Sequence, residues 1–240
     1  MGLDRADFLK ALDVIAGARM LRGASAETLV KVARAARLKS YTRGSMILAQ
    51  GDAARAIGIV ASGWLKLYRV APNGNEAVVR VFSEGESFGE AVALRHRPYP
   101  VSAEAVTDCS VLWLEADQLL HFVRDDPEIA VSLLTSTFVH LHELVSQIEQ
   151  LKSQNGAQRV AQFLLDLAGQ GSGGCTVTLP YDKVLIAAQL GIKPESLSRA
   201  FSKLKDHGVV IRNTEADIAD VAVLRGFAEE DPGAAWSKRE

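Results

Sequence analysis

Hydrophobic and polar positions follow two different periods in the first half of the chain. From about Arg5 to Ala36, apolar residues recur three and four positions apart, which predicts helices. The cap-like Ser25 divides this part into two apolar stripes, Phe8, Leu9, Leu12 and Ile15, then Leu29, Val30, Val32 and Ala33. From Leu38 the pattern changes to short alternating runs separated by glycines and turn residues, with strands continuing through 101–106 and 110–115. This alternation predicts a small antiparallel β-roll or sandwich, and Asn73-Gly74 predicts a hairpin loop within it.

A helical pattern returns at Asp117, and a long helix is predicted from after Pro127 to about Ser153. Along this helix apolar residues alternate three and four positions apart, as in a heptad seam. The seam consists of Val131, Leu134, Phe138, Leu141, Val145 and Ile148. We interpret it as a dimerisation surface. The alternative is a surface helix that lies on its own β-roll, and a second apolar side (Leu133, Leu144, Leu151) would let one helix do both.

The last third of the chain has the order of a winged helix-turn-helix. Gln154-Asn155-Gly156 breaks the long helix, and a further helix follows with Val160, Phe163, Leu164 and Leu167. The pattern continues with a glycine-rich loop, a short strand at 176–179 and two more short helices. It ends with strands at 209–211 and 217–221. The expected domains are a sensor β-roll at 1–126, a dimerisation helix at 127–154, a winged helix-turn-helix at 155–226 and a disordered acidic tail at 227–240.

The stretch Ile186–Leu204 predicts the helix-turn-helix itself. Gly191 can take the positive φ that the turn needs, and Pro194 stands where a first helical position belongs. The second helix has a buried stripe of Leu197, Ala200, Phe201 and Leu204. An ordinary corner between two helices is the alternative, but the outward face carries polar groups that can contact bases and phosphates.

We expect this outward face to bind double-stranded DNA. Glu195 can accept a hydrogen bond from cytosine, Arg199 can donate two to guanine, and Ser198 can sit against thymine. Ser202, Lys203 and Lys193 are expected to contact phosphates, and Ser196 faces outward beside them. The alternative is that Glu195 and Arg199, four positions apart, form a plain surface ion pair.

Composition constrains these expectations without changing them. The net charge of −2 does not predict a nucleic-acid binder, so DNA binding depends on a local basic patch. No apolar run of membrane-spanning length and no signal peptide is expected, and the two distant cysteines, Cys109 and Cys175, fit a reducing cytoplasm. No nucleophile–base set, metal pair or phosphate loop is apparent, so we expect no enzyme.

The order of these elements resembles the CRP/FNR family of dimeric bacterial transcription regulators. The resemblance covers about residues 10–225, and its markers are Gly44, Gln50-Gly51-Asp52, Gly63, the Gly85–Glu90 loop and Pro194–Arg199. It implies an α+β chain with a double-stranded β-helix or β-roll of the cyclic-nucleotide-binding type, a long dimerisation helix and a winged helix-turn-helix. It also implies RNA polymerase as a partner, and half-sites of the TTGA…TCAA type that Glu195, Ser198 and Arg199 contact.

In family members that bind cyclic nucleotides, a glycine-glutamate loop is followed by an Arg-Ser pair that grips the cyclic phosphate. Gly89 and Glu90 match the loop, but Tyr99-Pro100 stands at the place of the Arg-Ser pair. Without the guanidinium, the phosphate loses its strongest contact, so tight cAMP binding is not expected. The predicted effector-pocket residues are Gly89, Glu90, Tyr99, Pro100 and Ser102.

The N-terminal cysteine cluster of oxygen-sensing members is missing, because no cysteine precedes Cys109; an iron–sulfur cluster is therefore not expected. Two segments most resemble the DNR/NnrR branch of denitrification regulators, RPYPVSAEAVTDC and LPYDKVLIAAQLGIKPESLSR. That resemblance implies nitric oxide sensing through a b-type haem. The candidate axial ligands are His96, His121, His140 and His142. The alternatives are histidines with structural or solvated roles, and a regulator with another effector or none.

Overall fold

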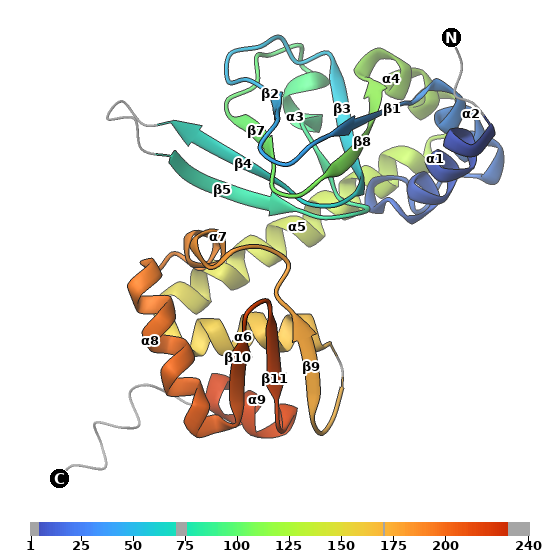
Figure 1. Cartoon of the computed structure of the whole chain (residues 1–240). Helices are drawn as coiled ribbons and strands as arrows, with labels where there is room; N and C mark the ends of the chain where they lie inside the picture. Colours follow the sequence, from blue (N-terminus) through green and yellow to red (C-terminus); the bar gives the residue numbers. More distant parts are fainter. Residues whose placement is uncertain (1–4, 71–75, 170, 230–240) are drawn as a thin grey trace. The chain divides into compact units, whose positions relative to one another are not determined.

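A computed structural model describes residues 5–70, 76–169 and 171–229 of the chain (Figure 1). The chain divides into two compact units, Met1–Leu141 and His142–Glu240, and the boundary falls within the long helix α5 (Glu128–Ser153). We describe each unit by itself.

The first unit begins with the predicted helices. These are α1 (Arg5–Gly17), the short 3-10 helix η1 (Arg19–Leu21) and α2 (Ala26–Ala35). Ser25 caps α2, since its hydroxyl accepts a hydrogen bond from the Thr28 amide at 3.2 Å. Asp126, just before α5, accepts hydrogen bonds from the Ser25 amide and the Thr28 hydroxyl. The start of the long helix is thus attached to the N-terminal helices.

Two four-stranded sheets, in which all pairs are antiparallel, form the β-roll. Their strand orders are β1-β8-β3-β6 and β2-β7-β4-β5. The strands are β1 (Arg37–Tyr41), β2 (Met46–Leu48), β3 (Ala56–Ser62), β4 (Leu65–Val70), β5 (Glu76–Phe82), β6 (Ser87–Phe88), β7 (Ser102–Ala105) and β8 (Cys109–Glu115). The predicted hairpin loop at 72–75 lies outside the described residues, but β4 and β5 on either side pair as a hairpin requires (Figure 1).

A close approach at Gly63 explains one glycine of the predicted pattern. Its φ is +76°, and a Cβ there would come within 2.3 Å of the Asp108 carbonyl oxygen. Only glycine fits a turn with both constraints.

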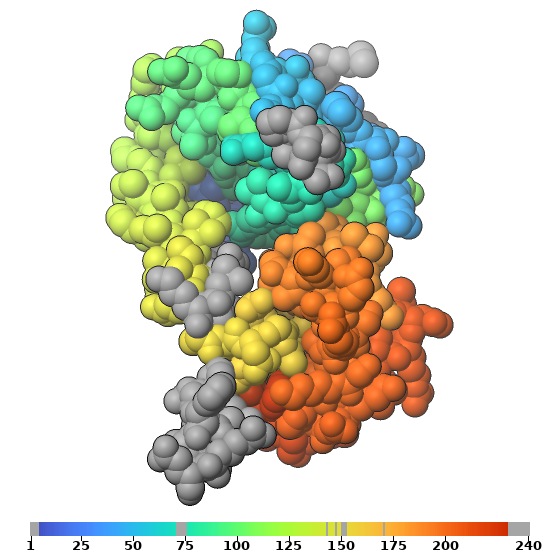
Figure 2. Space-filling model, turned by 90° about the vertical axis from the view of Figure 1, so that its left-hand side faces the viewer, coloured from blue at the N-terminus to red at the C-terminus, as the bar shows by residue number. Residues whose placement is uncertain are grey.

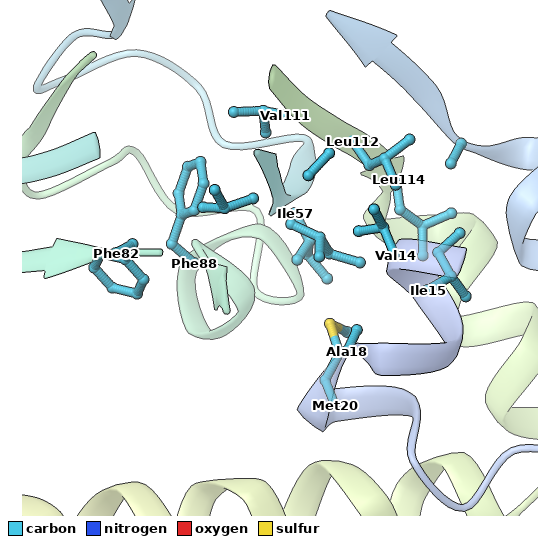
Figure 3. Packing of buried hydrophobic residues seen from close by; sticks show 14 of the residues in the cluster. Val14, Ile15, Ala18, Met20, Ile57, Phe82, Phe88, Val111, Leu112 and Leu114 are labelled. Carbon is cyan, nitrogen blue, oxygen red and sulfur yellow. The ribbon is translucent and has the colours of Figure 1, made fainter. Parts of the chain in front are cut away.

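The core of this unit lies between α1 and the β-roll. Val14 and Ile15 of α1 point toward Leu114 and Ile57 of the roll, as Figure 3 shows. Ile15 and Ile57 are fully buried, and Phe88 packs edge-on against Trp113 with ring centroids 5.6 Å apart. Each fully buried aliphatic side chain contributes roughly 1.5–3 kcal/mol of transfer free energy, so α1 belongs to the sensor fold.

Two short helices complete the first unit, α3 (Glu90–Ala93) and α4 (Ala116–Asp125). The first of them, at the glycine-glutamate loop, was not predicted. Gly89 immediately before it has a φ of +87°, which explains why the loop needs glycine at this position.

The second apolar side predicted for helix α5 is found only in part, because Leu144 is 41% exposed and the side chain of Leu151 lies outside the described residues. Ile129 is fully buried and Leu133 packs against the core of the first unit. The six predicted seam residues are all exposed, with Phe138 the most exposed at 66%. A soluble protein rarely leaves such a stripe uncovered; the seam therefore has the character of an interface.

The expectation that no apolar run reaches membrane-spanning length is wrong. Within the described residues, Glu128–Ser146 is one helix segment long and apolar enough to cross a membrane by length and composition. The reason is that α5 carries a core-facing side and a seam at once. By itself this is weak support for a membrane segment.

The second unit has the predicted winged helix-turn-helix. Helix α6 (Gly156–Ala168) is capped by Asn155, which forms a capping box with Gln158. The following elements are β9 (Cys175–Thr178), α7 (Lys183–Gln189), α8 (Pro194–Leu204), η2 (Lys205–His207), β10 (Val209–Arg212) and β11 (Glu215–Ile218). The three strands form one antiparallel sheet in the order β10-β11-β9.

The predicted disorder from Phe227 onward is wrong for residues 227–229, which belong to helix α9 (Val221–Glu229). Phe227 and Ala228 are buried, because they continue an apolar stripe from Val221 and Leu224. Val221, expected in a strand, begins this helix. The rest of the predicted tail, 230–240, lies outside the described residues.

Candidate DNA-reading face and effector pocket

The turn between α7 and α8 is built as the sequence predicts. Gly191 has a φ of +63°, and α8 begins at Pro194. Ile186 and Ala187 of α7 are fully buried, as are Leu197 and Leu204 of α8, while Ala200 and Phe201 are nearly so. These side chains hold the two helices together.

Arg159 of α6 supports this turn, a role that the sequence did not suggest. Its Nε donates to the Leu190 carbonyl oxygen at 3.2 Å, and its Nη1 donates to the Gln154 carbonyl oxygen at 2.9 Å. Both acceptors lie at helix ends, where carbonyl groups lack helical partners. One guanidinium therefore joins the end of α7 to the residues before α6.

The outward face of α8 is available to a ligand. Glu195 and Arg199 are exposed, and no hydrogen bond or ion pair to either is found among the described residues. The alternative of a surface ion pair between them is therefore not supported. The α7–α8 region, coloured orange, forms part of the surface of the second unit in Figure 2.

The serines on this face are turned back toward their own helix. The Ser198 hydroxyl donates to the Pro194 carbonyl oxygen at 3.3 Å, and Ser202 donates to the Ser198 carbonyl oxygen at 3.1 Å. With its hydroxyl bonded to its own helix, the exposed Ser198 is short enough to sit against a thymine methyl group. Ser196 is half-buried in the first turn.

The lysines of the predicted phosphate-contacting group have different environments. Lys193 is exposed at the N-cap of α8, beside the helix end that attracts anions. Lys203 instead lies with its Nζ 5.3 Å from the centre of the Phe227 ring on α9. This cation–π contact directs Lys203 toward α9, so Lys193 is better placed to contact a phosphate.

In the first unit, a hollow of about 150 Å³ lies at the predicted effector pocket. No charged residue lines it. Its lining consists of Gly89, Tyr99 and Pro100 together with the apolar residues Leu48, Leu67, Phe88, Ala91, Val92 and Val101. Pockets for drug-sized ligands are usually about 300–1,000 Å³, so this hollow is small as well as uncharged.

Two of the predicted pocket residues are placed elsewhere. The buried Ser102 hydroxyl accepts a hydrogen bond from the Gln50 amide at 3.0 Å, and Ser102 is not among the lining residues. Glu90 is half-buried at the start of α3 and does not line the hollow either. The hollow therefore has neither the Ser102 hydroxyl nor the Glu90 carboxylate in its lining.

The four candidate haem ligands do not fit an axial site in this hollow, because none of them lines it. His96 and His121 are exposed, and His96 lies 3.6 Å from the Asp117 carboxylate. In His140, the ring Nε2 lies 2.9 Å from Nη1 of Arg80, which also pairs with Glu86. His142 is exposed. Among the described residues no group of three or more potential metal ligands gathers.

A β-roll of this type joined to a winged helix-turn-helix with an open recognition helix defines a DNA-binding regulator. Comparison with known proteins agrees. A model of the cyclic nucleotide-binding domain matches residues 38–126, and a model of the Crp-like helix-turn-helix domain matches residues 158–227. The chain belongs to the CRP/FNR family of transcription regulators.

Three relatives indicate how the chain stands within this family. The Cyclic AMP receptor protein of Thermus thermophilus is 31% identical over 189 residues, which is 78% of this chain and 86% of that protein. A crystal structure of a candidate cyclic nucleotide binding protein from Ruegeria pomeroyi is 51% identical, with a TM-score of 0.70, covering 93% of this chain and 99% of that one. DNR of Pseudomonas aeruginosa is 29% identical, with a TM-score of 0.51, covering 90% and 96%.

Proposed function

We propose that the protein is a dimeric regulator that reads a TTGA-N6-TCAA-like palindrome with α8. The observation that carries this proposal is the unpaired outward face, where Glu195 and Arg199 stand four positions apart on an exposed helix. A carboxylate can accept from cytosine and a guanidinium can donate to guanine O6 and N7. The protein acts on transcription in the cytoplasm, together with RNA polymerase, and not as an enzyme.

The two copies associate through the α5 seam. Its six exposed apolar side chains repeat at heptad spacing, which suits a two-stranded coiled coil. A two-fold dimer places two recognition helices on successive major grooves, so the half-sites are palindromic and about one helical turn apart.

Cyclic AMP is not the effector in this proposal. The hollow has no cationic residue in its lining, and a buried phosphate without a charged partner loses several kcal/mol of solvation, on the order of magnitude known for buried ions. The matching family model describes a fold, and Tyr99-Pro100 stands where the phosphate-gripping pair is expected.

Nitric oxide sensing through haem depends on the resemblance to DNR alone. Because none of the candidate histidines lines the hollow, the structural observations favour the other candidate, a regulator that binds DNA without a small-molecule effector. Purified protein reconstituted with haem distinguishes the two. A stoichiometric Soret band that disappears on His→Ala substitution at one of the four positions would favour the haem sensor.

DNA binding is tested by fluorescence anisotropy with a labelled TTGA-N6-TCAA duplex. The control duplex has the same composition with both half-sites scrambled, and a third has a spacer longer by five base pairs. We expect the palindrome to bind at least about 1,000-fold more tightly than the scrambled duplex, which is the lower end for specific regulators. Equal affinity for all three would contradict the proposal.

A further inference from the structure

Tyr99 has an unusually fixed position for a residue in a loop. Its amide donates to the Asp52 carbonyl oxygen and its carbonyl oxygen accepts from the Gly51 amide, both at 2.9 Å. The neighbouring Pro98 forms an isolated β-bridge with Ala53. The Gln50-Gly51-Asp52 turn therefore holds the backbone on which this side chain stands.

The side chain of Tyr99 points inward from that backbone. It is 8% exposed, and its hydroxyl donates to the Ala56 carbonyl oxygen at 2.7 Å. The ordinary pKa of a phenol is already well above neutral and burial raises that of Tyr99 further, so the hydroxyl is a hydrogen-bond donor.

The ring lies against the glycine that marks the effector loop. A Cβ at Gly89 would be 3.2 Å from Cε1 of Tyr99, which is tighter than an ordinary contact. Gly89 therefore leaves just enough room for the ring. The resemblance to the CRP/FNR family implies an effector beside this loop, and here the loop packs against a side chain of the same chain.

What remains beside the ring is the small uncharged hollow described above. At about 150 Å³, it has half the lower limit of ordinary ligand pockets. Phe88 and Leu67 close its apolar walls. The space at this loop is thus divided between a phenol ring and a residual void.

We propose that Tyr99 is an internal substitute for the effector. Its ring fills the effector position, and its hydrogen bond to Ala56 ties the loop to β3, so the sensor unit holds its DNA-binding conformation without a small molecule. This inference rests on the proposed function, since the conformation that it describes is the one that binds DNA. It predicts that removal of the ring creates a dependence on a ligand, and that the missing piece can be added back from solution.

The test removes the ring and supplies 4-methylphenol, the compound that corresponds to a tyrosine side chain. Full-length Tyr99→Gly should melt at a lower temperature than wild type and bind DNA about 5- to 150-fold more weakly, the usual range of coupling between two sites. Millimolar 4-methylphenol should restore a large part of both properties. Wild-type protein should bind DNA with no ligand and should not respond to the phenol.

Tyr41→Gly is the matched control. Tyr41 is also a buried tyrosine of the first unit, 9% exposed, but its hydroxyl accepts from Trp113 Nε1 and it does not line the hollow. This variant should lose melting temperature while its DNA affinity stays within about twofold of wild type. Tyr99→Phe keeps the ring but loses the hydrogen bond to Ala56, so its DNA affinity should lie between those of wild type and Tyr99→Gly.

Several outcomes would overturn the proposal. One is a folded Tyr99→Gly variant with wild-type DNA affinity and no response to 4-methylphenol. Another is a wild-type protein that binds DNA only after a small molecule is added. If Tyr99→Gly does not fold, Tyr99→Leu is measured in the same assays. This variant lacks the ring and the hydroxyl, and undiminished DNA affinity would again reject the substitute role.

If wild type does not bind the palindrome specifically, the target-site proposal fails. The Tyr99 variants are then compared on non-specific DNA at low salt, where backbone contacts suffice.

Discussion

The outward face of α8 and the hollow beside Tyr99 are opposite kinds of surface. On α8, a carboxylate and a guanidinium stand exposed without partners among the described residues. In the hollow, apolar side chains surround a tyrosine whose hydroxyl is already bonded to Ala56. The α8 face exposes polar groups that another molecule can bond, whereas the tyrosine hydroxyl at the hollow is already bonded within the chain.

This difference concerns charged side chains: the α8 face exposes them, and the lining of the hollow contains none. Contacts to base edges carry sequence information, and in the proposed function the exposed polar groups of α8 make them. The first unit keeps the glycine turns and the fold, and no charged residue lines its hollow. A common fold with a different lining is how one architecture serves several inputs.

The largest expected effect removes the pairing on which the DNA-reading face depends. Phe138→Glu places a charge in the middle of the seam and should convert the dimer to a monomer. Because linked binding of two half-sites gains roughly 10²–10⁴ in affinity, DNA binding should fall by that factor. Analytical ultracentrifugation and anisotropy measure the two effects.

Val139→Glu is the control for this change, since Val139 is also exposed on α5, at 47%, but lies outside the heptad seam. It should remain dimeric. A Phe138→Glu protein that stays a dimer and binds the palindrome normally would show that the seam is not the interface.

Arg199→Ala tests whether the α8 face carries sequence information. It should cost about 1–3 kcal/mol on the palindrome and much less on scrambled DNA, because a base contact is lost without a change in backbone contacts. Competition anisotropy with single-base variants of the half-site measures this difference. Equal loss on both duplexes would assign Arg199 to a phosphate.

Lys193 and Lys203 provide a finer comparison within the same face. Lys193→Ala should weaken binding to all sequences and reduce the slope of log K against log salt by about 1. Lys203→Ala should alter that slope less, since its Nζ lies over Phe227. A titration of affinity against salt for both variants is the measurement, and a larger change for Lys203 would contradict the assignment.

The smallest expected effect is that of cyclic AMP on the wild-type protein. A ligand at 100 times its Kd would stabilise the fold by about 2.7 kcal/mol, which shifts the melting temperature of a chain of this size by several degrees, at about 2–4 °C per kcal/mol. We expect no shift with millimolar cAMP. A clear rise would mean that the hollow accommodates the nucleotide despite its uncharged lining.

The DNA-reading end and the long helix were predictable because their signals are local. Gly191 and Pro194 follow from the backbone conformation required at one position, and the apolar stripe of α8 follows from helical periodicity. Alternating strands and the seam of α5 follow from periodicity in the same way. Such signals need no knowledge of distant neighbours.

The interior of the sensor was not predictable in this way. The sequence identifies Tyr99 as a predicted pocket residue that stands where an Arg-Ser pair is expected, but it does not reveal the contacts with Ala56 and Gly89, which join residues more than nine positions apart. Arg159 likewise acts on carbonyl groups of other elements. Helix α9 was not predicted, because its apolar stripe is short and acidic residues follow it directly.

Gln158 has a consequence for how short the DNA-binding half can be. The side chain is buried; its Oε1 accepts from the Asn155 amide and its Nε2 donates to the Phe227 carbonyl oxygen at 3.3 Å. A fragment that stopped at Gly226 would remove the Phe227 carbonyl oxygen that this buried amide donates to, together with the buried Phe227 side chain itself. We therefore expect C-terminal trimming to destabilise this unit once it reaches α9, because the Phe227 and Ala228 carbonyl oxygens accept hydrogen bonds from Gln158 and Gln154.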